Sequence, residues 1–435
     1  MRRSLVVLAV AAALSAVGTA AAGTTFVVDG GGWGHGVGMS QYGALGFASH
    51  GWSYERILAH YYRGTRLGIL PNRTVRVLLA EGQARVLIGS KKPFGRIAKQ
   101  RRLTLRPGDR GVTVKGVRKL GGSIRYEPGA SPLRVDGKAY RGTVTVFAEH
   151  GRLLAVNEVS LDHYLRGVVP WEMPDHWPLA ALEAQAVVAR SYTLATLHPG
   201  NRFDLYPDTR DQVYGGIEAE DPRTNQAVAA TAGRVVTYGG RVAITYYHST
   251  SGGRTAAIQD VWPKAAPEPY LVSVEDPFDY LSKHHRWPAL VLTRSQLAAA
   301  LHVTGLRDAL VERNSSGRVA DVRVVGASGD RRLPGQDVRE LLGLRSTNFS
   351  LRVLSLDAAS KLVRRGKALE LSGFARGLGN LRLERAVGAG AWEKVRDVRL
   401  APDGRFRAVV RPEGPTRYRL ANHIAVGTPI SVATH

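Results

Sequence analysis

The spacing of hydrophobic positions changes along the chain. Between residues 70 and 157, apolar and polar side chains alternate, for example over residues 74–79, 112–114 and 133–135, which predicts short β-strands. Residues 178–197 are largely apolar and predict a long, mostly buried helix. Beyond residue 350, short apolar stretches recur between turn residues and predict a small all-β sandwich of the immunoglobulin-like type. The predicted fold class is therefore α+β.

The two ends of the sequence set the expected domain boundaries. Residues 1–23 have the form of a signal peptide, with Arg2 and Arg3 before an apolar run and small residues at the expected cleavage site. We expect an α+β domain over residues 24–350, with its β-rich part at 70–157, and the sandwich over 351–435. Export to the cell wall or the extracellular space follows; an uncleaved signal that anchors the protein in a membrane is the alternative.

Charge and cysteine content narrow the classes of partner. The formal net charge is +24, which favours an anionic partner. For an exported protein this predicts anionic wall polymers or lipid head groups as partners, and no nucleic acid. The arginines are spread along the chain, however, as a compositional bias of the genome would also produce. Cysteine is absent, so disulfides and thiolate metal sites are excluded. Nucleotide-binding motifs are also absent, and we expect neither a cofactor nor a metal.

A single carboxylate, Glu172, stands between Pro170 and Pro174, with Trp171 and Met173 beside it. Apolar neighbours desolvate a carboxylate and raise its pKa, which is what a general acid needs near neutral pH. Pro170 should break the helical path just before the glutamate. The alternative is a surface glutamate near a helix start, where the helix dipole favours negative charge.

The predicted helix at residues 178–197 carries Gln185 and Arg190 among apolar side chains. A buried arginine must be paired with an acidic group. We expect Glu183 or a carboxylate of the site to be its partner.

Polar residues also gather in loops, where binding residues are common. His35 lies in a glycine-rich segment, and His248 begins a stretch of small hydroxyl residues and glycines after a predicted strand. Tyr214 follows a polar loop and could stack on a sugar ring. The alternatives are a histidine satisfied by backbone groups in a tight turn and an ordinary turn rich in aspartate.

Five blocks of sequence resemble the stage II sporulation protein D family (SpoIID/LytB). The blocks are residues 32–44 (GWGHGVGMSQYGA), 161–174 (LDHYLRGVVPWEMP), 181–192 (ALEAQAVVARSY), 248–253 (HSTSGG) and 342–349 (LGLRSTNF). Together they cover most of residues 26–349, and each block is specific.

The resemblance implies a peptidoglycan lytic transglycosylase, because family members cut glycan strands, while others are described as amidase enhancers. The family's catalytic glutamate falls on Glu172. It would protonate the glycosidic oxygen and then take the proton of the muramoyl 6-hydroxyl, leaving a 1,6-anhydro end without consuming water. The implied partners are peptidoglycan glycan strands and a wall amidase. The side chains expected to line the groove as substrate binders are His35, Gln41, Gln185, Arg190, Tyr214, His248, Ser249 and Ser251.

Two other functions compete with this one. A non-catalytic protein could use its charge and its sandwich to bind the wall or to activate an amidase. A water-using muramidase would need a second carboxylate near Glu172, such as Asp208 or Asp211.

The chain departs from the family in two respects. The glycine-rich block at residues 32–44 comes last in the family but first here, which we interpret as a circular permutation. It predicts that residues 26–29 and 350–353 lie close together. Some family members hold zinc on cysteine and histidine near the HST block, whereas this chain has Ser251 there and no cysteine.

Overall fold

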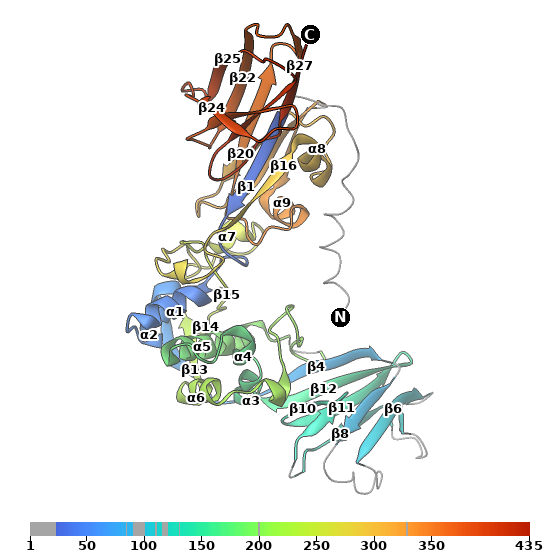
Figure 1. Cartoon of the computed structure of the whole chain (residues 1–435). Coiled ribbons are helices and arrows are strands. Elements are labelled where there is room, and N and C mark those ends of the chain that lie inside the picture. Colours follow the sequence, from blue (N-terminus) through green and yellow to red (C-terminus); the bar gives the residue numbers. More distant parts are fainter. Residues whose placement is uncertain are drawn as a thin grey trace. The chain divides into compact units, whose positions relative to one another are not determined.

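A computed structural model describes residues 23–83, 85–89, 101–108, 111–114, 121–129, 131–198, 201–327 and 329–435. The predicted signal peptide therefore falls almost entirely outside the described residues. The described chain forms two compact units, which we treat separately (Figure 1). Unit 1 comprises residues 23–36, 250–265 and 282–435, and unit 2 comprises residues 37–249 and 266–281. The structure mixes helices with a larger share of strands, arranged in several sheets.

Two five-stranded sheets of unit 1 enclose one hydrophobic core. The first has the order β16 (Trp287–Thr293), β1 (Gly23–Gly30), β20 (Phe349–Ala358), β22 (Leu369–Arg376) and β25 (Arg405–Val410). The second has the order β21 (Leu362–Val363), β27 (Ile430–Thr434), β26 (Thr416–Ala421), β23 (Arg382–Val387) and β24 (Glu393–Asp397). Val27, Leu371 and Tyr418 are among the side chains that meet in the core. Strands of both sheets therefore form a β-sandwich.

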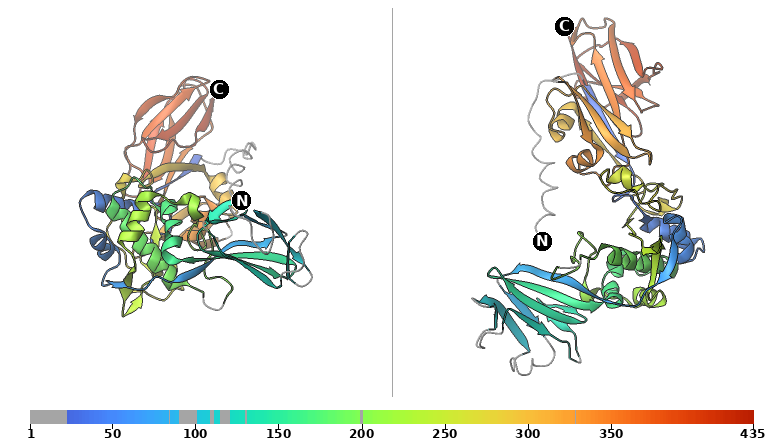
Figure 2. Two further views of the ribbon diagram at one scale, coloured as in Figure 1. Left: turned by 90° about the horizontal axis from the view of Figure 1, so that it is seen from below. Right: turned by 180° about the vertical axis from the view of Figure 1, so that it is seen from behind.

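Strands β1 and β20 join segments from opposite ends of the chain. They pair antiparallel, with Gly23 opposite Leu356 and Gly30 opposite Phe349, and β1 lies between β16 and β20 in both figures (Figures 1 and 2). The predicted proximity of residues 26–29 and 350–353 is thus confirmed. The pair has the geometry of a hairpin whose turn is missing. The circular permutation itself stays a prediction.

The sheet also continues past residue 351, where the sequence predicts a domain boundary. β20 pairs with β1 on one side and with β22 on the other. Its side chains alternate between two cores: Leu354 and Leu356 pack in the sandwich, whereas Leu351 and Val353 pack in a neighbouring cluster. One strand therefore belongs to both parts of unit 1.

That neighbouring cluster fills the rest of unit 1. It packs β1 and β20 against a three-stranded sheet and two helices through apolar side chains that include Phe26, Leu297 and Val322. These elements are β17 (Asp308–Arg313), β18 (Val319–Gly326), β19 (Gly329–Pro334), α8 (Arg294–Ala300) and α9 (Gly335–Leu341), and the short α7 (Ile258–Val261) also belongs to unit 1. Thr293 and Gln296 form a capping box at the start of α8.

Unit 2 contains the predicted β-rich part. One sheet has the order β4 (Thr74–Gln83), β12 (Arg152–Ser160), β11 (Thr143–Glu149) and β8 (Ser123–Tyr126), and a second has the order β10 (Lys138–Tyr140), β9 (Leu133–Val135), β5 (Val86–Gly89), β6 (Arg102–Gly108) and β7 (Gly111–Val114). The alternating strands predicted at residues 74–79, 112–114 and 133–135 are confirmed. Asp136 and Gly137 both have positive φ, which suits the tight turn between β9 and β10.

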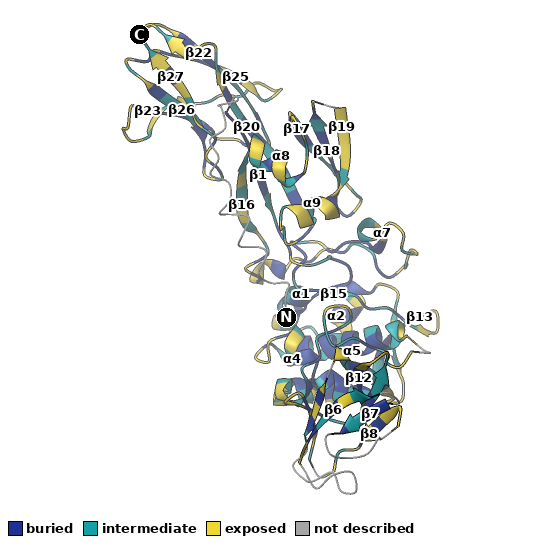
Figure 3. Cartoon of the chain, turned by 90° about the vertical axis from the view of Figure 1, so that its right-hand side faces the viewer, coloured by how far each residue is buried: buried dark blue, intermediate teal, exposed yellow. Residues whose placement is uncertain are grey.

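Helices form the remainder of unit 2. They are α1 (Gln41–Ser49), α2 (Tyr54–Tyr61), α3 (Leu161–Arg166), α4 (Val169–Glu172), α5 (Leu179–Thr196), η1 (Gly216–Ala219), α6 (Pro222–Ala230) and η2 (Asp279–Leu281), accompanied by β2 (Met39–Ser40), β3 (Arg66–Ile69), β13 (Arg234–Tyr238), β14 (Arg241–Val242) and β15 (Tyr247–His248). α5 confirms the predicted long helix and is largely buried (Figure 3). Within the described residues, no helix is long and apolar enough to cross a membrane.

Candidate active site

Glu172 is the last residue of a one-turn helix. Pro170 lies in the first turn of α4, which continues through Glu172, and the backbone becomes extended only at Met173. The prediction of a break just before Glu172 is therefore wrong, because a proline in the first helical turn removes no hydrogen bond of the helix. Met173 is buried, but Trp171 is 62% exposed and Pro174 is also exposed. The prediction that Trp171 and Pro174 enclose the carboxylate is therefore wrong. A single helical turn points consecutive side chains in different directions, so sequence neighbours do not share one environment.

The carboxyl group of Glu172 meets two neutral side chains from distant parts of unit 2. Gln41 donates from Nε2 to Oε2 at 3.1 Å, and the Tyr247 phenol also hydrogen-bonds to the carboxyl group. Burial raises the pKa of Glu172, while the hydrogen bonds from Tyr247 and Gln41 oppose the shift only in part. This carboxyl group therefore keeps its proton to higher pH than an exposed glutamate does.

A short parallel bridge brings the two partners together. Tyr247 of β15 lies opposite Met39 of β2, and Gln41 follows two residues later at the start of α1. Ser40 caps that helix, because its Oγ accepts a hydrogen bond from the Gly43 backbone N–H at 3.1 Å. Gln41 is only 8% exposed. Its amide is thus held in place before any ligand binds.

Tyr247 is in turn held by a buried polar chain. Its hydroxyl donates to Gln212 Oε1 at 3.1 Å, and Gln212 Nε2 donates to Thr193 Oγ1 at 2.8 Å. Thr193 donates to the Ala189 carbonyl in α5 at 2.8 Å. Sequence reasoning missed Tyr247, Gln212 and Thr193. The position of Tyr247 just before the HSTSGG block, and of Gln212 inside the polar loop, were the available signals.

The acidic residues of that loop have partners of their own. Asp208 forms an exposed ion pair with Arg210 at 2.8 Å, which lowers the pKa of Asp208. Asp211 accepts a hydrogen bond from the Tyr206 backbone N–H at 2.7 Å, and burial raises its pKa. Among the described residues, neither carboxylate shifts the pKa of Glu172. A role of either aspartate as a second carboxylate beside Glu172 stays a prediction.

Arg190 is paired, but not as predicted. It is 2% exposed and donates from its guanidinium to Asp162 Oδ1 at 3.0 Å, with further hydrogen bonds to two backbone carbonyls. The predicted partner, Glu183 or a site carboxylate, is wrong, because Asp162 lies in α3, which packs against α5. Gln185 is fully buried, and neither of its polar side-chain atoms has a partner among the described residues. Substrate binding by Arg190 and Gln185 stays a prediction.

Tyr214 is 6% exposed and belongs to the hydrophobic core of unit 2. Its hydroxyl donates to Asn157 Oδ1 at 3.0 Å, and its ring centroid lies 5.1 Å from that of Tyr164. The ring is thus not presented to solvent for stacking on a sugar, contrary to the prediction. His248 is 5% exposed, with Nδ1 3.2 Å from the Val37 carbonyl, and the Ser249 carbonyl accepts from the Tyr42 N–H.

The remaining predicted binders belong to unit 1. His35 lies with its ring centroid 5.2 Å from that of Trp262. Ser251 is fully buried, and its Oγ accepts from the Gly253 N–H at 3.0 Å. Their participation in a site with Glu172 stays a prediction.

Some members of the SpoIID/LytB family hold zinc, but the described residues of this chain offer no matching set of ligands. Ser251 replaces a thiolate with a weak hydroxyl ligand. Within the described part of the chain, no group of three histidine, aspartate or glutamate side chains could hold a metal ion. We therefore derive no step through a metal.

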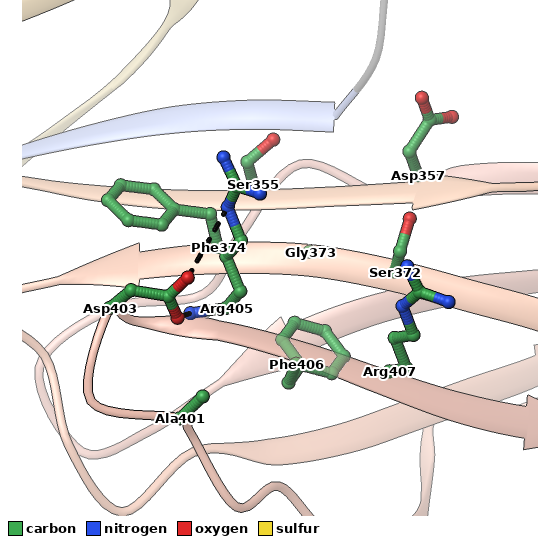
Figure 4. A pocket seen from close by; sticks show the side chains of 10 residues that line it. All are labelled: Ser355, Asp357, Ser372, Gly373, Phe374, Ala401, Asp403, Arg405, Phe406 and Arg407. Carbon is green, nitrogen blue, oxygen red and sulfur yellow. Dashed lines mark hydrogen bonds and ion pairs between the residues drawn. The ribbon is translucent and has the colours of Figure 1, made fainter.

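A pocket of about 570 Å³ lies on the face of β20, β22 and β25 (Figure 4). Ser355, Ser372 and Arg407 are among its lining residues. Arg405 pairs with Asp403 at 3.7 Å, as the dashed line shows, and Arg407 pairs with Glu370 at 3.5 Å. Both arginines of the pocket thus have a carboxylate partner.

Comparison with known proteins shows what this region resembles. Residues 149–238 match the SpoIID model, described as a stage II sporulation protein. The amidase enhancer of Bacillus subtilis is 36% identical over 175 residues, which cover 39% of this chain and 24% of that protein. An uncharacterized protein of Brachyspira hyodysenteriae is 35% identical over 159 residues, which cover 36% of this chain and 42% of that protein.

A further relative matches over a longer stretch. Stage II sporulation protein D of Bacillus amyloliquefaciens is 29% identical over 256 residues, which cover 53% of this chain and 70% of that protein. The chain thus spans less than half the length of the Brachyspira protein and of the amidase enhancer. No solved structure matches the chain.

Proposed function

We propose that the protein is an exported lytic transglycosylase that cleaves peptidoglycan glycan strands through Glu172, because residues 149–238 match the SpoIID model. The observation that carries this proposal is the partly buried carboxyl group with a raised pKa, whose described hydrogen-bonding neighbours, Gln41 and Tyr247, are neutral. A glycosidase normally needs two carboxylates. A transglycosylase that uses a hydroxyl of its own substrate as nucleophile needs one.

The proposed reaction begins with Glu172 as the acid. Its proton passes to the glycosidic oxygen while the bond from that oxygen to the muramoyl C1 breaks. The carboxylate left behind then accepts the proton of the muramoyl 6-hydroxyl, whose oxygen bonds to C1. Attack within one sugar has a high effective concentration. The products are a free 4-hydroxyl on one strand and a 1,6-anhydro end on the other.

Gln41 and Tyr247 act on the same protonation state of Glu172 in this cycle. Gln41 donates to Oε2 and stabilises the ionised form that follows proton transfer. The hydrogen bond with Tyr247 also lowers the pKa of Glu172 and favours that ionised form. Burial favours the protonated form that the first step requires. The surroundings of Glu172 thus support both protonation states of the mechanism.

The experiment is mass spectrometry of the products from purified glycan strands, with and without stem peptides. Wild type should release anhydro-muramoyl ends, and Glu172→Gln should release none while keeping its fold. Glu183→Gln is the matched control, because Glu183 is also a partly buried glutamate of unit 2 with a raised pKa. It should retain activity. Turnover by Glu172→Gln would refute the assignment, and reducing ends would indicate hydrolysis.

The amidase-enhancer relative supports one alternative. In that case the protein would release nothing from any strand alone, but would increase product release by a wall amidase. Glu172→Gln would then enhance the amidase as well as wild type does.

A further inference from the structure

Trp33 of unit 1 displays an exposed indole on a fixed backbone. The residue is 44% exposed and lies between Gly32 and Gly34, whose φ angles of +86° and +108° suit glycine. The backbone N–H of Trp33 donates to the Thr250 carbonyl at 2.7 Å, and the backbone carbonyl of Trp33 accepts from the Thr250 N–H at 3.2 Å. Because the backbone is already ordered, a ligand that packs on the indole would lose little binding energy to ordering the loop.

Three basic side chains, Lys283, Arg286 and Arg345, belong to the segments around the Trp33 loop. The Arg345 guanidinium carbon lies 4.9 Å from the Trp33 ring centroid. The ring of His284 meets the same indole edge-on, with centroids 4.4 Å apart. Lys283 directly precedes His284 in the chain. Burial lowers the pKa of His284, and Arg345 and Lys283 lower it further. Arg286 donates to the Gly252 carbonyl, and its Nη1 would lie 2.7 Å from a Cβ on Gly31, directly before Gly32.

These cations differ from other arginines of unit 1. Arg352 pairs with Asp29 at 2.8 Å and Arg376 with Asp308 at 2.7 Å. Among the described residues, Lys283, Arg286 and Arg345 form no ion pair with a carboxylate, and all three are exposed. Uncompensated cations beside an exposed aromatic ring favour an anionic ligand that also has an apolar face.

A groove continues from this cluster. It has a volume of about 230 Å³, and Arg345 lines it together with Trp287, Leu290 and Leu344. The Trp287 indole N–H donates to the Gly32 carbonyl at 3.2 Å, which ties the groove to the backbone of the Trp33 loop. An extended ligand could therefore contact Trp33 and the groove together, with Arg345 between them.

We propose that Trp33, Lys283, Arg286 and Arg345 bind an acidic carbohydrate, a glycan whose sugar rings carry carboxylate groups. The C–H face of a sugar ring would pack on the indole, and the guanidinium of Arg345 would bind the carboxylate through two parallel hydrogen bonds. A single-stranded nucleic acid would instead need several aromatic rings in succession along a basic groove. Within the described part of this cluster, Trp33 is the exposed ring. The proposal does not depend on catalysis by Glu172.

The test uses the full chain as Glu172→Gln, so that no glycan is cut, and measures binding by calorimetry. The probes are an oligogalacturonate, neutral oligo-N-acetylglucosamine and oligothymidylate. The oligogalacturonate should bind most tightly, and its affinity should fall as salt rises. Arg345→Gln and Trp33→Ala should each weaken it about tenfold, and Lys283→Gln a few-fold. Trp33→Phe should lose less than Trp33→Ala, which separates loss of the aromatic ring from misfolding.

Arg307→Gln is the matched control, because it removes the charge of another exposed arginine of unit 1. It should change the affinity less than twofold. Equal weakening by Arg307→Gln and Arg345→Gln would mean general attraction of polyanions and would overturn the proposal. Tighter binding of oligothymidylate, or equal binding of the neutral oligosaccharide, would overturn it as well.

Discussion

Arg190, which is buried, and Glu172, which is partly buried, are ionisable side chains of the same unit, but their charged groups have different partners. Arg190 has an opposite charge, Asp162, at 3.0 Å, and two backbone carbonyls complete its contacts. Among the described residues, the side chains that shift the pKa of Glu172, Gln41 and Tyr247, are both neutral. A buried charge that is paired with an opposite charge stabilises a fold, but the pair holds it in one protonation state. A buried acid without a counter-charge can change its protonation state, so it is the better candidate for chemistry.

The largest expected effect comes from removing the counter-charge of Arg190. Asp162→Asn would leave a 2% exposed guanidinium without its ion pair. Breaking a buried pair from one side costs about 3 kcal/mol of unfolding free energy. Urea unfolding monitored by circular dichroism measures the change.

The control is Asp208→Asn, which breaks the ion pair between Asp208 and Arg210. Its length of 2.8 Å is similar to that of the Arg190 pair, but both of its side chains are about half exposed. It should cost less than about 1 kcal/mol. Equal losses for the two variants would mean that the Arg190 pair is no more structural than a surface pair, and the comparison would fail.

A second effect concerns the protonation of Glu172. Gln41→Leu removes a donor that stabilises the ionised form, so the pKa of Glu172 should rise further. A general acid acts while protonated, and activity is lost as pH rises through its pKa. The alkaline limb of kcat/KM for glycan cleavage should therefore move to higher pH, with a rate loss of about tenfold at neutral pH.

Gln336→Leu is the matched control for that profile. Gln336 Nε2 also donates to a glutamate, Glu340, at 2.7 Å, but on an exposed helix of unit 1. Its pH profile should equal that of wild type. A shift of the Gln41→Leu limb toward acid would contradict the assigned role of the Gln41 hydrogen bond.

A third effect is a gain in stability. A carboxyl group with a raised pKa in the folded protein destabilises it above the unfolded pKa, and this penalty becomes complete above the folded pKa. Glu172→Gln should therefore raise the unfolding free energy at neutral pH, by on the order of 1 kcal/mol. The gain should vanish in acid, below the ordinary range of a glutamate. Glu127→Gln, at a 74% exposed glutamate, should show no such gain in the same thermal unfolding series.

The sequence singled out Glu172 as the candidate acid but identified only some of its neighbours. Pro170 and the family resemblance mark Glu172, and Gln41 was predicted as a binder and lies 3.1 Å from it. Tyr247 was missed because its contact depends on the pairing of β15 with β2, which no local pattern reveals. The pairing of β20 with strands on both sides is non-local in the same way.

Aromatic residues show why local sequence misleads about exposure. Tyr214 follows a polar loop and yet is buried, because its hydroxyl donates to Asn157 and its ring packs against that of Tyr164. Trp171 precedes the acid and yet faces solvent. The residue type determines which contacts a side chain is able to make. The direction of the side chain from the backbone determines whether it makes them or faces solvent.

The smallest effect on stability is expected at Trp171. Its side chain is 62% exposed, so Trp171→Ala should change the unfolding free energy by less than about 0.5 kcal/mol. Directly before Glu172, however, an exposed indole is placed to pack against a sugar of the bound strand. KM for glycan should then rise about fivefold, equivalent to ~1 kcal/mol, with kcat changed less. Tyr280→Ala, at another exposed aromatic residue of unit 2, should leave both constants unchanged. An unchanged KM in Trp171→Ala would show that the bound strand reaches Glu172 without contacting this indole. Substrate positioning would then depend on other side chains around the acid, such as Gln41 and Tyr247.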